Sequence, residues 1–333
     1  MRVRNDVRGL PLTELGLGAA QFGNLYRETS DEQAASAVAA AWDGGIRYFD
    51  TAPHYGLGLS EKRLGALLSE RPRSELVISS KVGRILESSP QTVDRMDDQG
   101  FVVPAATVRR WDFSRDGILR SVEDSLRRTG LDRLDILYLH DPDDHWQQAA
   151  TTGISTLIEL REQGVVTAVG AGMNHSAPLA ELIRRADVDL IMVAGEITLL
   201  KHNALDELLP LALERGVGVV AVGVYNSGIL GQNHPSGDAK FNYDAAPAGA
   251  IARANVIADI CEAHGVSLPV AAIAYPLLHP AVVSVVLGAR EASQVTSNVD
   301  RYRTAVPPEV WVELHAAGLI PPVPTTNLRQ GAV

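Results

Sequence analysis

The sequence predicts an α/β protein folded as a (β/α)8 barrel, the TIM-barrel architecture, in a single domain over residues 1–333. The chain has 333 residues, and a barrel of about 250 residues with inserted loops would use this length. Eight short apolar segments alternate with longer segments of helical pattern. These apolar segments are nearly continuous, as strands buried on both faces require. A doubly wound sheet is the alternative that these observations leave open.

The order of the elements follows from the same alternation. Strands are expected at residues 15–20, 46–50, 75–81, 134–140, 165–172, 189–195, 216–223 and 281–289. Helices are expected at residues 31–45, 60–70, 114–130, 156–164, 177–186, 205–216 and 252–265, several of them ending in glycine as helices often do. Two connections are long, residues 82–113 after the third strand and residues 224–250 after the seventh. Both follow carboxyl ends of strands, where barrel enzymes carry their sites, so we expect substrate or cofactor loops.

The composition favours a small molecule as the partner. Asp and Glu number 40 against 30 Lys and Arg, which gives a net charge of −10. An acidic chain without a long basic run argues against nucleic acid or an anionic membrane. Cys261 is the only cysteine, so no internal disulfide can form and a reducing cytoplasm fits. No apolar run of about 18 residues is present to span a bilayer, and we expect a cytoplasmic protein.

Three predicted strands end on polar residues that belong together chemically. The second strand ends on Asp50, the third on Lys81 and the fourth on His140, and Tyr55 follows Asp50 by five positions. In a barrel these strand ends meet at one rim. Asp50 needs a partner because a lone buried charge is costly, and Lys81 can supply it. A phenol transfers protons poorly at neutral pH unless a cation stabilises its phenolate, so Lys81 is expected to tune Tyr55 while His140 orients a substrate oxygen.

The segments around these four residues share a pattern. Residues 45–65 read G-x-R-x-F-D-T-A-x-x-Y-G followed by G-x-S-E-x-x-L-G, residues 78–84 read ISSKVGR, and residues 135–143 read DILYLHDPD. Over nearly the whole chain the sequence resembles the aldo-keto reductase superfamily. The resemblance implies that Asp50, Tyr55, Lys81 and His140 form the catalytic tetrad, with Tyr55 as general acid-base. It also implies hydride transfer between NAD(P) and a carbonyl or alcohol carbon.

A nicotinamide cofactor needs a place for its phosphates. The segment after the first strand starts as G-x-G with Gly16 and Gly18, but Gln21 stands where a dinucleotide fingerprint has its third glycine. A barrel instead binds phosphate near the loops after strands seven and eight, here residues 223–232 and 287–298. We therefore expect the cofactor at those two loops.

The resemblance assigns individual residues to the cofactor. It implies that Gly223 to Leu230 wrap the pyrophosphate, that Gly288 and Arg290 meet the adenosine ribose or its 2′-phosphate, that Gln294 and Asn298 reach the adenine, and that Asn174 holds the carboxamide. The complete predicted set is Gly18, Asn174, Gly223, Tyr225, Asn226, Ser227, Gly228, Leu230, Gly288, Arg290, Gln294 and Asn298. Arg290 favours a 2′-phosphate and Glu291 opposes one, so the choice between NAD and NADP stays open.

Two departures from the family pattern point to one branch. Ala194 and Ile197 replace a Gln and a Tyr after the sixth strand, and Val222 and Gly223 stand where a tyrosine stacks on the nicotinamide. With these departures the chain resembles the branch that contains L-fucose dehydrogenase, D-threo-aldose 1-dehydrogenase and pyridoxal 4-dehydrogenase. This resemblance implies oxidation of an aldose at C1 to the lactone.

Other functions stay open at this stage. Within the family, the alternatives are pyridoxal 4-dehydrogenase and NADPH-dependent reduction of an aldehyde or ketone. The cluster HDPDDH at residues 140–145 could belong to a metal-dependent barrel hydrolase, although Lys81 would repel the ion and we expect no metal. A nicotinamide-binding regulatory subunit is a further possibility, since some members of the superfamily have that role. No coiled-coil heptad or exposed apolar stripe indicates an oligomeric state.

Overall fold

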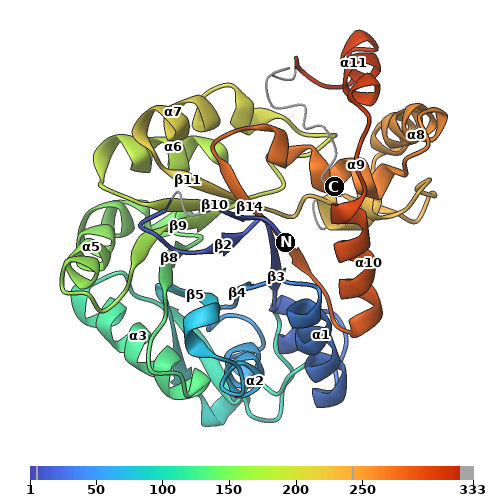
Figure 1. The fold of residues 1–333 in the computed structure, drawn as a ribbon. Coiled ribbons are helices and arrows are strands. Elements are labelled where there is room, and N and C mark those ends of the chain that lie inside the picture. The colour runs from blue at the N-terminus through green and yellow to red at the C-terminus, as the bar shows by residue number, and fades with distance from the viewer. Residues whose placement is uncertain (5–6, 242–243, 323–333) are drawn as a thin grey trace.

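The computed structural model describes residues 1–4, 7–241 and 244–322 of the chain. Eight parallel strands close into a barrel with helices around it (Figure 1). The barrel strands are β3 (Leu15–Gly18), β4 (Tyr48–Asp50), β5 (Val77–Val82), β8 (Ile136–His140), β9 (Ala168–Met173), β10 (Leu190–Ala194), β11 (Gly218–Val222) and β14 (Val282–Gly288). Each lies within or overlaps one of the eight predicted strands, so the predicted barrel is confirmed and the doubly wound sheet is excluded.

Two apolar layers explain why these strands are almost continuously apolar. Along β8, Ile136 and Tyr138 face the barrel interior, whereas Leu137 and Leu139 pack against the surrounding helices. Successive side chains of a strand point to opposite faces, so His140 belongs to the interior row. The same period places Asp50 above Tyr48 on β4 and Lys81 above Val77 on β5. Asp50, Lys81 and His140 are therefore the last interior positions of their strands.

The helices close the outer layer. They are α1 (Asp31–Asp43), α2 (Leu59–Leu68), α3 (Arg115–Thr129), α4 (Trp146–Gln148), α5 (Ile154–Glu162), α6 (Ser176–Arg185), α7 (Leu208–Arg215), α8 (Ala248–Ala263), α9 (Leu268–Ala274), α10 (Ala292–Arg303) and α11 (Pro308–Ala316). Their ends follow local chemistry: Ser30 and Gln33 form a capping box at α1. Gly130 ends α3 with a φ of 68°, a left-handed conformation that glycine adopts without strain.

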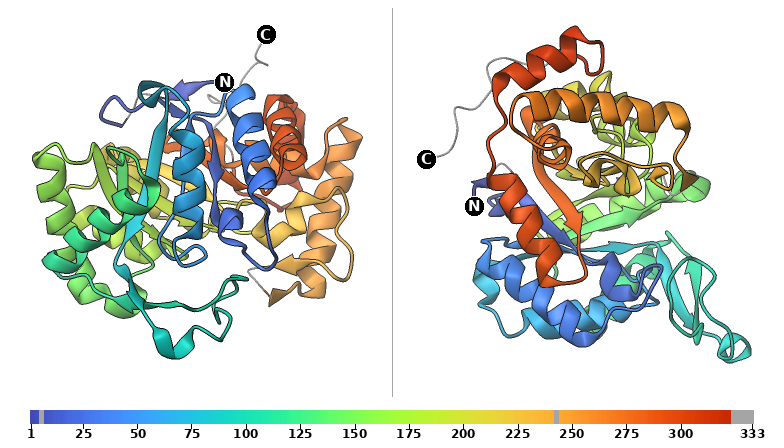
Figure 2. Two further views of the ribbon diagram at one scale, coloured as in Figure 1. Left: turned by 90° about the horizontal axis from the view of Figure 1, so that it is seen from below. Right: turned by 90° about the vertical axis from the view of Figure 1, so that its right-hand side faces the viewer.

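A second apolar core lies beside the barrel. It packs α8, α9 and α11 against one another and includes Ile257, Cys261 and Trp311, and Figures 1 and 2 show these helices together at one side. In the described part of the chain no single helix is long and apolar enough to cross a membrane; only α8 taken with Leu268–Leu277, at a bend of 94°, meets the length and hydropathy.

The amino-terminal end of the barrel is closed by the first residues. Strands β1 (Val3–Arg4) and β2 (Leu12–Thr13) pair antiparallel, and Val7, Leu10 and Leu12 pack into the interior cluster of the barrel. Only the opposite, carboxyl end is left for a site.

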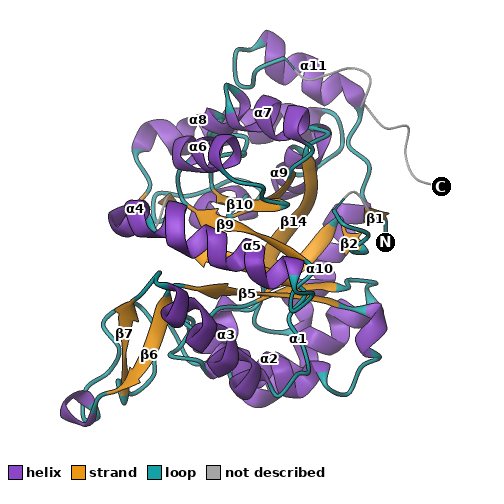
Figure 3. Cartoon of the chain, turned by 90° about the vertical axis from the view of Figure 1, so that its left-hand side faces the viewer, coloured by secondary structure: helices purple, strands orange, loops and turns teal. Residues whose placement is uncertain are grey.

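Both long connections are structured. The first forms a hairpin of β6 (Arg84–Ser88) and β7 (Thr107–Trp111), which projects from the barrel in Figures 2 and 3. Residues between these strands return toward the barrel, where Tyr26 N donates to Gly100 O at 2.7 Å and Val102 N to Asn24 O at 2.9 Å. The second connection contains a short 3-10 helix at residues 226–231 and the pair β12 (Lys240–Phe241) and β13 (Asp244–Ala245).

Candidate active site

A buried ion pair forms the base of the site at the carboxyl rim. Lys81 Nζ lies 2.7 Å from Asp50 Oδ2 and also donates to Thr51 O at 2.9 Å. Ser79 Oγ donates to the other carboxylate oxygen of Asp50 at 2.7 Å and lies 3.1 Å from the Tyr48 hydroxyl. Burial alone would lower the pKa of Lys81, but the charge of Asp50 holds that pKa above its ordinary value. Lys81 is therefore a fixed cation, and the predicted pair is present.

Tyr55 folds back over this pair, as predicted. Its ring centre lies 4.8 Å from Lys81 Nζ and 5.8 Å from the centre of the His140 ring, edge to face. Two glycines fix this loop, because a Cβ on Gly23 would lie 2.5 Å from the Tyr55 carbonyl carbon and one on Gly56 would lie 2.3 Å from Gly23 O. Burial raises the pKa of Tyr55 and outweighs the opposing charge of Lys81. Lys81 acts in the expected direction, but Tyr55 is a phenol here.

His140 completes the group as a neutral imidazole. It is 5% exposed, and burial together with the charges of Arg84 and Lys81 holds its pKa well below the ordinary value. Its Nδ1 is buried without a hydrogen-bond partner among the described residues. A neutral histidine can donate one hydrogen bond to a substrate oxygen without bringing a second positive charge beside Lys81.

The projecting hairpin adds residues that the sequence did not reveal. Phe101 packs edge-on against His54 at 5.2 Å between ring centres and lies 6.1 Å from Tyr55. Arg109 Nη2 donates to His54 O at 2.9 Å. Burial, and after it the charges of Arg84 and Arg109, lowers the pKa of His54 to about 2, so this ring is neutral. His54 stands inside the quoted motif, where its position was the available signal, whereas nothing marked Phe101.

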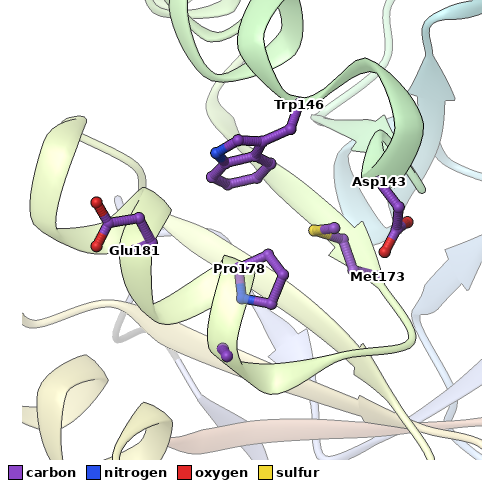
Figure 4. Close-up of a pocket in the computed structure, with 6 residues that line it drawn as sticks. Asp143, Trp146, Met173, Pro178 and Glu181 are labelled. Atoms are coloured by element: carbon purple, nitrogen blue, oxygen red, sulfur yellow. The ribbon is translucent and has the colours of Figure 1, made fainter.

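A hollow of about 330 Å³ borders the rim on the side of β9 (Figure 4). Met173 and the rings of Trp146 and Pro178 line it, together with Ala177, while Asp143 and Glu181 supply carboxylates. The described residues, including those of the HDPDDH cluster, hold no group of three His, Cys, Asp or Glu suited to a metal ion.

Glycines line the rim where the cofactor is expected. Gly18 on β3 and Gly288 on β14 are neighbours in register, and Gly223 follows β11. A Cβ on Gly288 would lie 2.4 Å from the amide of Gln21, whose buried Oε1 has no hydrogen-bond partner among the described residues. Glycine at position 288 therefore lets the Gln21 amide pack against the rim, and the unpartnered Oε1 is an acceptor that a ligand can satisfy, so these residues are compatible with a dinucleotide.

The loop after β11 is a tight turn. Asn226, Ser227 and Gly228 are consecutive residues with positive φ of 44°, 63° and 110°, and the N–H groups of Asn226 and Gly228 donate to Gly223 O and Tyr225 O, each at 2.9 Å. Leu230 is buried beneath them. The predicted wrapping of a pyrophosphate by Gly223 to Leu230 stays a prediction. The hydroxyl of Tyr225, the residue before this turn, donates to Asn298 Oδ1 at 3.2 Å. The structure thus joins Tyr225 to Asn298, and the adenine role of Asn298 stays a prediction.

Arg290 is already engaged within the protein. Its guanidinium donates to Leu25 O, to Arg27 O at 3.0 Å and to Thr29 Oγ1 at 2.6 Å, and the residue is 7% exposed. Gln294 Oε1 accepts from Arg290 N at 2.8 Å. Both terminal amino groups of Arg290 thus donate within residues 24–29, hereafter the 24–29 segment. The predicted contacts of Arg290 and Gln294 with adenosine stay predictions.

Asn174 is the remaining predicted cofactor residue. It is exposed after β9, and its Nδ2 lies 3.4 Å from Asp141 Oδ1, beside the tetrad. This position is compatible with a contact to a nicotinamide over Tyr55 and His140, which stays a prediction.

A barrel oxidoreductase with a nicotinamide cofactor is the class of protein that this fold and site define. Residues 14–318 match the Aldo/keto reductase family, and the chain belongs to that family. It is 47% identical over 316 residues to D-threo-aldose 1-dehydrogenase from a Pseudomonas species, covering 94% of this chain and 96% of that protein. It is 39% identical over 329 residues to pyridoxal 4-dehydrogenase from Microbacterium luteolum, with the same coverage.

Solved structures agree with this assignment. The holo form of an aldo-keto reductase from Bacillus halodurans superimposes with a TM-score of 0.71 at 26% identity, covering 96% of this chain and 97% of that chain. A glycerol dehydrogenase from Gluconobacter oxydans gives a TM-score of 0.77 at 23% identity, over 97% of both chains, and this similarity shows the fold alone. The predicted family and branch are confirmed.

Proposed function

We propose that the protein oxidises an aldose at C1 to the lactone, with NAD(P)+ as hydride acceptor. The observation that carries the proposal is the Asp50–Lys81 pair beneath Tyr55, with neutral His140 facing the same ring. The relative named D-threo-aldose 1-dehydrogenase, 47% identical along nearly the whole chain, supports the substrate class.

The four residues divide the proton chemistry. When bound, the cofactor supplies a two-electron acceptor for the hydrogen that leaves C1 as hydride. The hydroxyl proton of C1 passes to the Tyr55 oxygen, so Tyr55 must first be a phenolate, which the positive charge of Lys81 favours. His140 donates a hydrogen bond to the reacting oxygen and holds it near Tyr55. Asp50 keeps the ammonium of Lys81 in place.

The contacts around α10 support a preference for NAD over NADP. Arg290 directs both terminal amino groups of its guanidinium at the 24–29 segment. Glu291 accepts hydrogen bonds from Ser293 Oγ and Gln33 Nε2, which lower the pKa of its carboxyl group. A charged carboxylate at this position would repel a 2′-phosphate and could accept a hydrogen bond from a 2′-hydroxyl. We expect NADH to quench the protein fluorescence at lower concentration than NADPH does.

The activity is tested by the absorbance of reduced nicotinamide. Purified protein is mixed with NAD+ or NADP+ and with L-fucose, L-galactose, D-arabinose or pyridoxal, beside Tyr55→Phe. Loss of general acid-base catalysis is expected to lower the rate by about a hundredfold to ten-thousandfold. Tyr302→Phe is the matched control, since its hydroxyl donates to Glu14 at 2.8 Å near the amino-terminal end of the barrel. No oxidation of any aldose would refute the proposal.

Pyridoxal is the second candidate substrate. The relative named pyridoxal 4-dehydrogenase is 39% identical over the same length, and the rings of His54 and Phe101 offer an aromatic wall beside Tyr55. If NAD+ or NADP+ is reduced in the presence of pyridoxal and with none of the three sugars, pyridoxal is the substrate. In either case the lone, buried thiol of Cys261 fits a reducing cytoplasm, where we place the enzyme.

A further inference from the structure

A second ion pair stands at the rim beside the tetrad. Arg84 Nη2 lies 2.6 Å from Asp141 Oδ2. Arg84 begins β6, two residues after β5 ends at Val82, and Asp141 directly follows His140 at the end of the neighbouring strand β8. The side chain of Arg84 is 11% exposed and that of Asp141 is 25% exposed, so the pair is partly covered yet open on one side.

This pair contacts His140, Asn174 and Trp111 at the carboxyl rim. Asp141 Oδ2 is 3.5 Å from His140 Nε2, and Asp141 Oδ1 is 3.4 Å from Asn174 Nδ2. The guanidinium of Arg84 lies 4.4 Å from the ring centre of Trp111 on the hairpin. The pair is thus enclosed between the tetrad histidine and the hairpin.

The backbone of Asp141 is strained. Its φ is 39°, in the left-handed region that side-chain-bearing residues seldom adopt, and strain of this kind gathers at functional sites. Asp141 N donates to Gly172 O at 2.9 Å, which holds the carboxylate at the rim.

The pair and its surroundings have unused hydrogen-bonding capacity. The carboxylate of Asp141 accepts one short hydrogen bond, from Arg84, and its other contacts, with Asn174 and His140, are at 3.4 and 3.5 Å. Arg84 Nε and His54 Nδ1 are buried with no hydrogen-bond partner among the described residues. A buried polar atom without a partner is costly, and a ligand with adjacent donors and acceptors removes that cost. Adjacent hydroxyl groups have both.

We propose that Asp141 and Arg84 recognise the ring hydroxyls next to the reacting carbon of a neutral sugar, Asp141 by accepting hydrogen bonds and Arg84 by donating them. This inference rests on the proposed aldose oxidation and names the part of the substrate that selects it. The two charges of the pair cancel, so the pair selects hydroxyl groups and not a charged phosphate or carboxylate on the sugar. His140 and Tyr55 act on the C1 hydroxyl, and the pair fixes the ring that carries it.

The test compares Asp141→Asn with the unmodified enzyme on the aldose it oxidises fastest and on the 2-deoxy and 3-deoxy forms of that sugar. Asp141→Asn is expected to lower kcat/KM for the parent sugar by about a hundredfold, as loss of a charged acceptor for a hydroxyl does. For the deoxy form that lacks the contacted hydroxyl, the unmodified enzyme is already slow, and the variant is expected to lose less than about threefold more. NADH binding, followed by fluorescence quenching, is expected to be unchanged.

Two further variants guard the interpretation. Asp144→Asn makes the same change at an exposed position three residues along and is expected to leave all rates unchanged. Arg84→Lys keeps the charge but removes the planar donor group, and should show the same selective loss if Asp141→Asn does not fold.

The outcomes separate the two proposals. Equal losses on the parent and on both deoxy sugars would mean that the pair is structural and would overturn the inference, as would no loss at all. An unmodified enzyme that oxidises no aldose would overturn the proposed function and this inference together.

Discussion

Replacing Lys81 by Met should move the pH dependence of oxidation to higher pH. Tyr55 must lose its proton before it can accept one from the substrate, so the rate rises as pH passes the pKa of Tyr55 in the complex. The charge of Lys81 lowers that pKa. Without this charge the phenolate forms only at higher pH, so the rising limb of the plot of oxidation rate against pH shifts to higher pH.

The distance between the two groups gives the size of the effect. With 4.8 Å from Lys81 Nζ to the centre of the Tyr55 ring, the attraction between unit charges is about 3 kcal/mol at an effective dielectric constant of about 20. This energy corresponds to on the order of a hundredfold in the phenolate fraction at a fixed pH below the limb. At neutral pH the oxidation rate of the variant should fall by a comparable factor.

Adding Asp50→Asn separates the pH effect of Lys81→Met from its loss of stability. Lys81→Met leaves Asp50 as a buried charge without its cation, which costs about 3–5 kcal/mol of stability. Asp50→Asn combined with Lys81→Met removes both charges and leaves no lone ion. We expect the double variant to recover thermal stability while keeping the shifted limb.

The assay is the steady-state oxidation of the preferred aldose between neutral and alkaline pH, at saturating cofactor. Reduction of the lactone or of an aldehyde gives the complementary control, since there Tyr55 must be protonated and the falling limb should move to higher pH as well. If the oxidation rate of the single and double variants rises at the same pH as that of the unmodified enzyme, with only a uniform loss of rate, Lys81 does not lower the pKa of Tyr55 and the reasoning is refuted.

Three further predictions concern the support of the tetrad and the cofactor. Ser79→Ala removes the donor at 2.7 Å from Asp50 Oδ1 and should lower the free energy of unfolding by about 1–3 kcal/mol, measured by urea denaturation; an unchanged midpoint would show that another group replaces the hydroxyl. Gly288→Val places atoms against the amide of Gln21 and should weaken NADH binding in fluorescence titrations while the melting temperature changes little, whereas unchanged NADH affinity would place the cofactor elsewhere. Glu291→Gln should raise the affinity for NADPH relative to NADH by about tenfold, the effect of removing one like charge beside a phosphate, and an unchanged ratio would contradict the proposed preference for NAD.

The barrel and the rim positions of Asp50, Lys81 and His140 could be predicted because both depend on strand periodicity. A strand buried on two faces is apolar to its end, so the first polar side chain of the interior row marks the rim. Asp50 and His140 are those residues on their strands. Their convergence then follows from barrel closure, which needs no knowledge of the loops.

The cover of the site could not be predicted in the same way. Phe101 reaches Tyr55 from the middle of a connection whose path depends on its pairing with the 24–29 segment, and no local pattern encodes such a contact. Arg290 shows the same limit, since its charge suggested a phosphate contact while its surroundings engage it with backbone carbonyls. The helices α9 and α11 were not among the predicted helices.

The 24–29 segment contacts both long loops. It pairs with the loop that carries Phe101 over the tetrad, it holds the guanidinium of Arg290 at the foot of α10, and Lys240 of the other long loop lies 5.4 Å from the ring centre of Tyr26. A ligand that moves either loop must therefore move this segment or strain it. Cofactor and sugar are expected to bind cooperatively, each changing the affinity for the other by the same factor. An exchange of either loop between relatives would then alter both affinities at once.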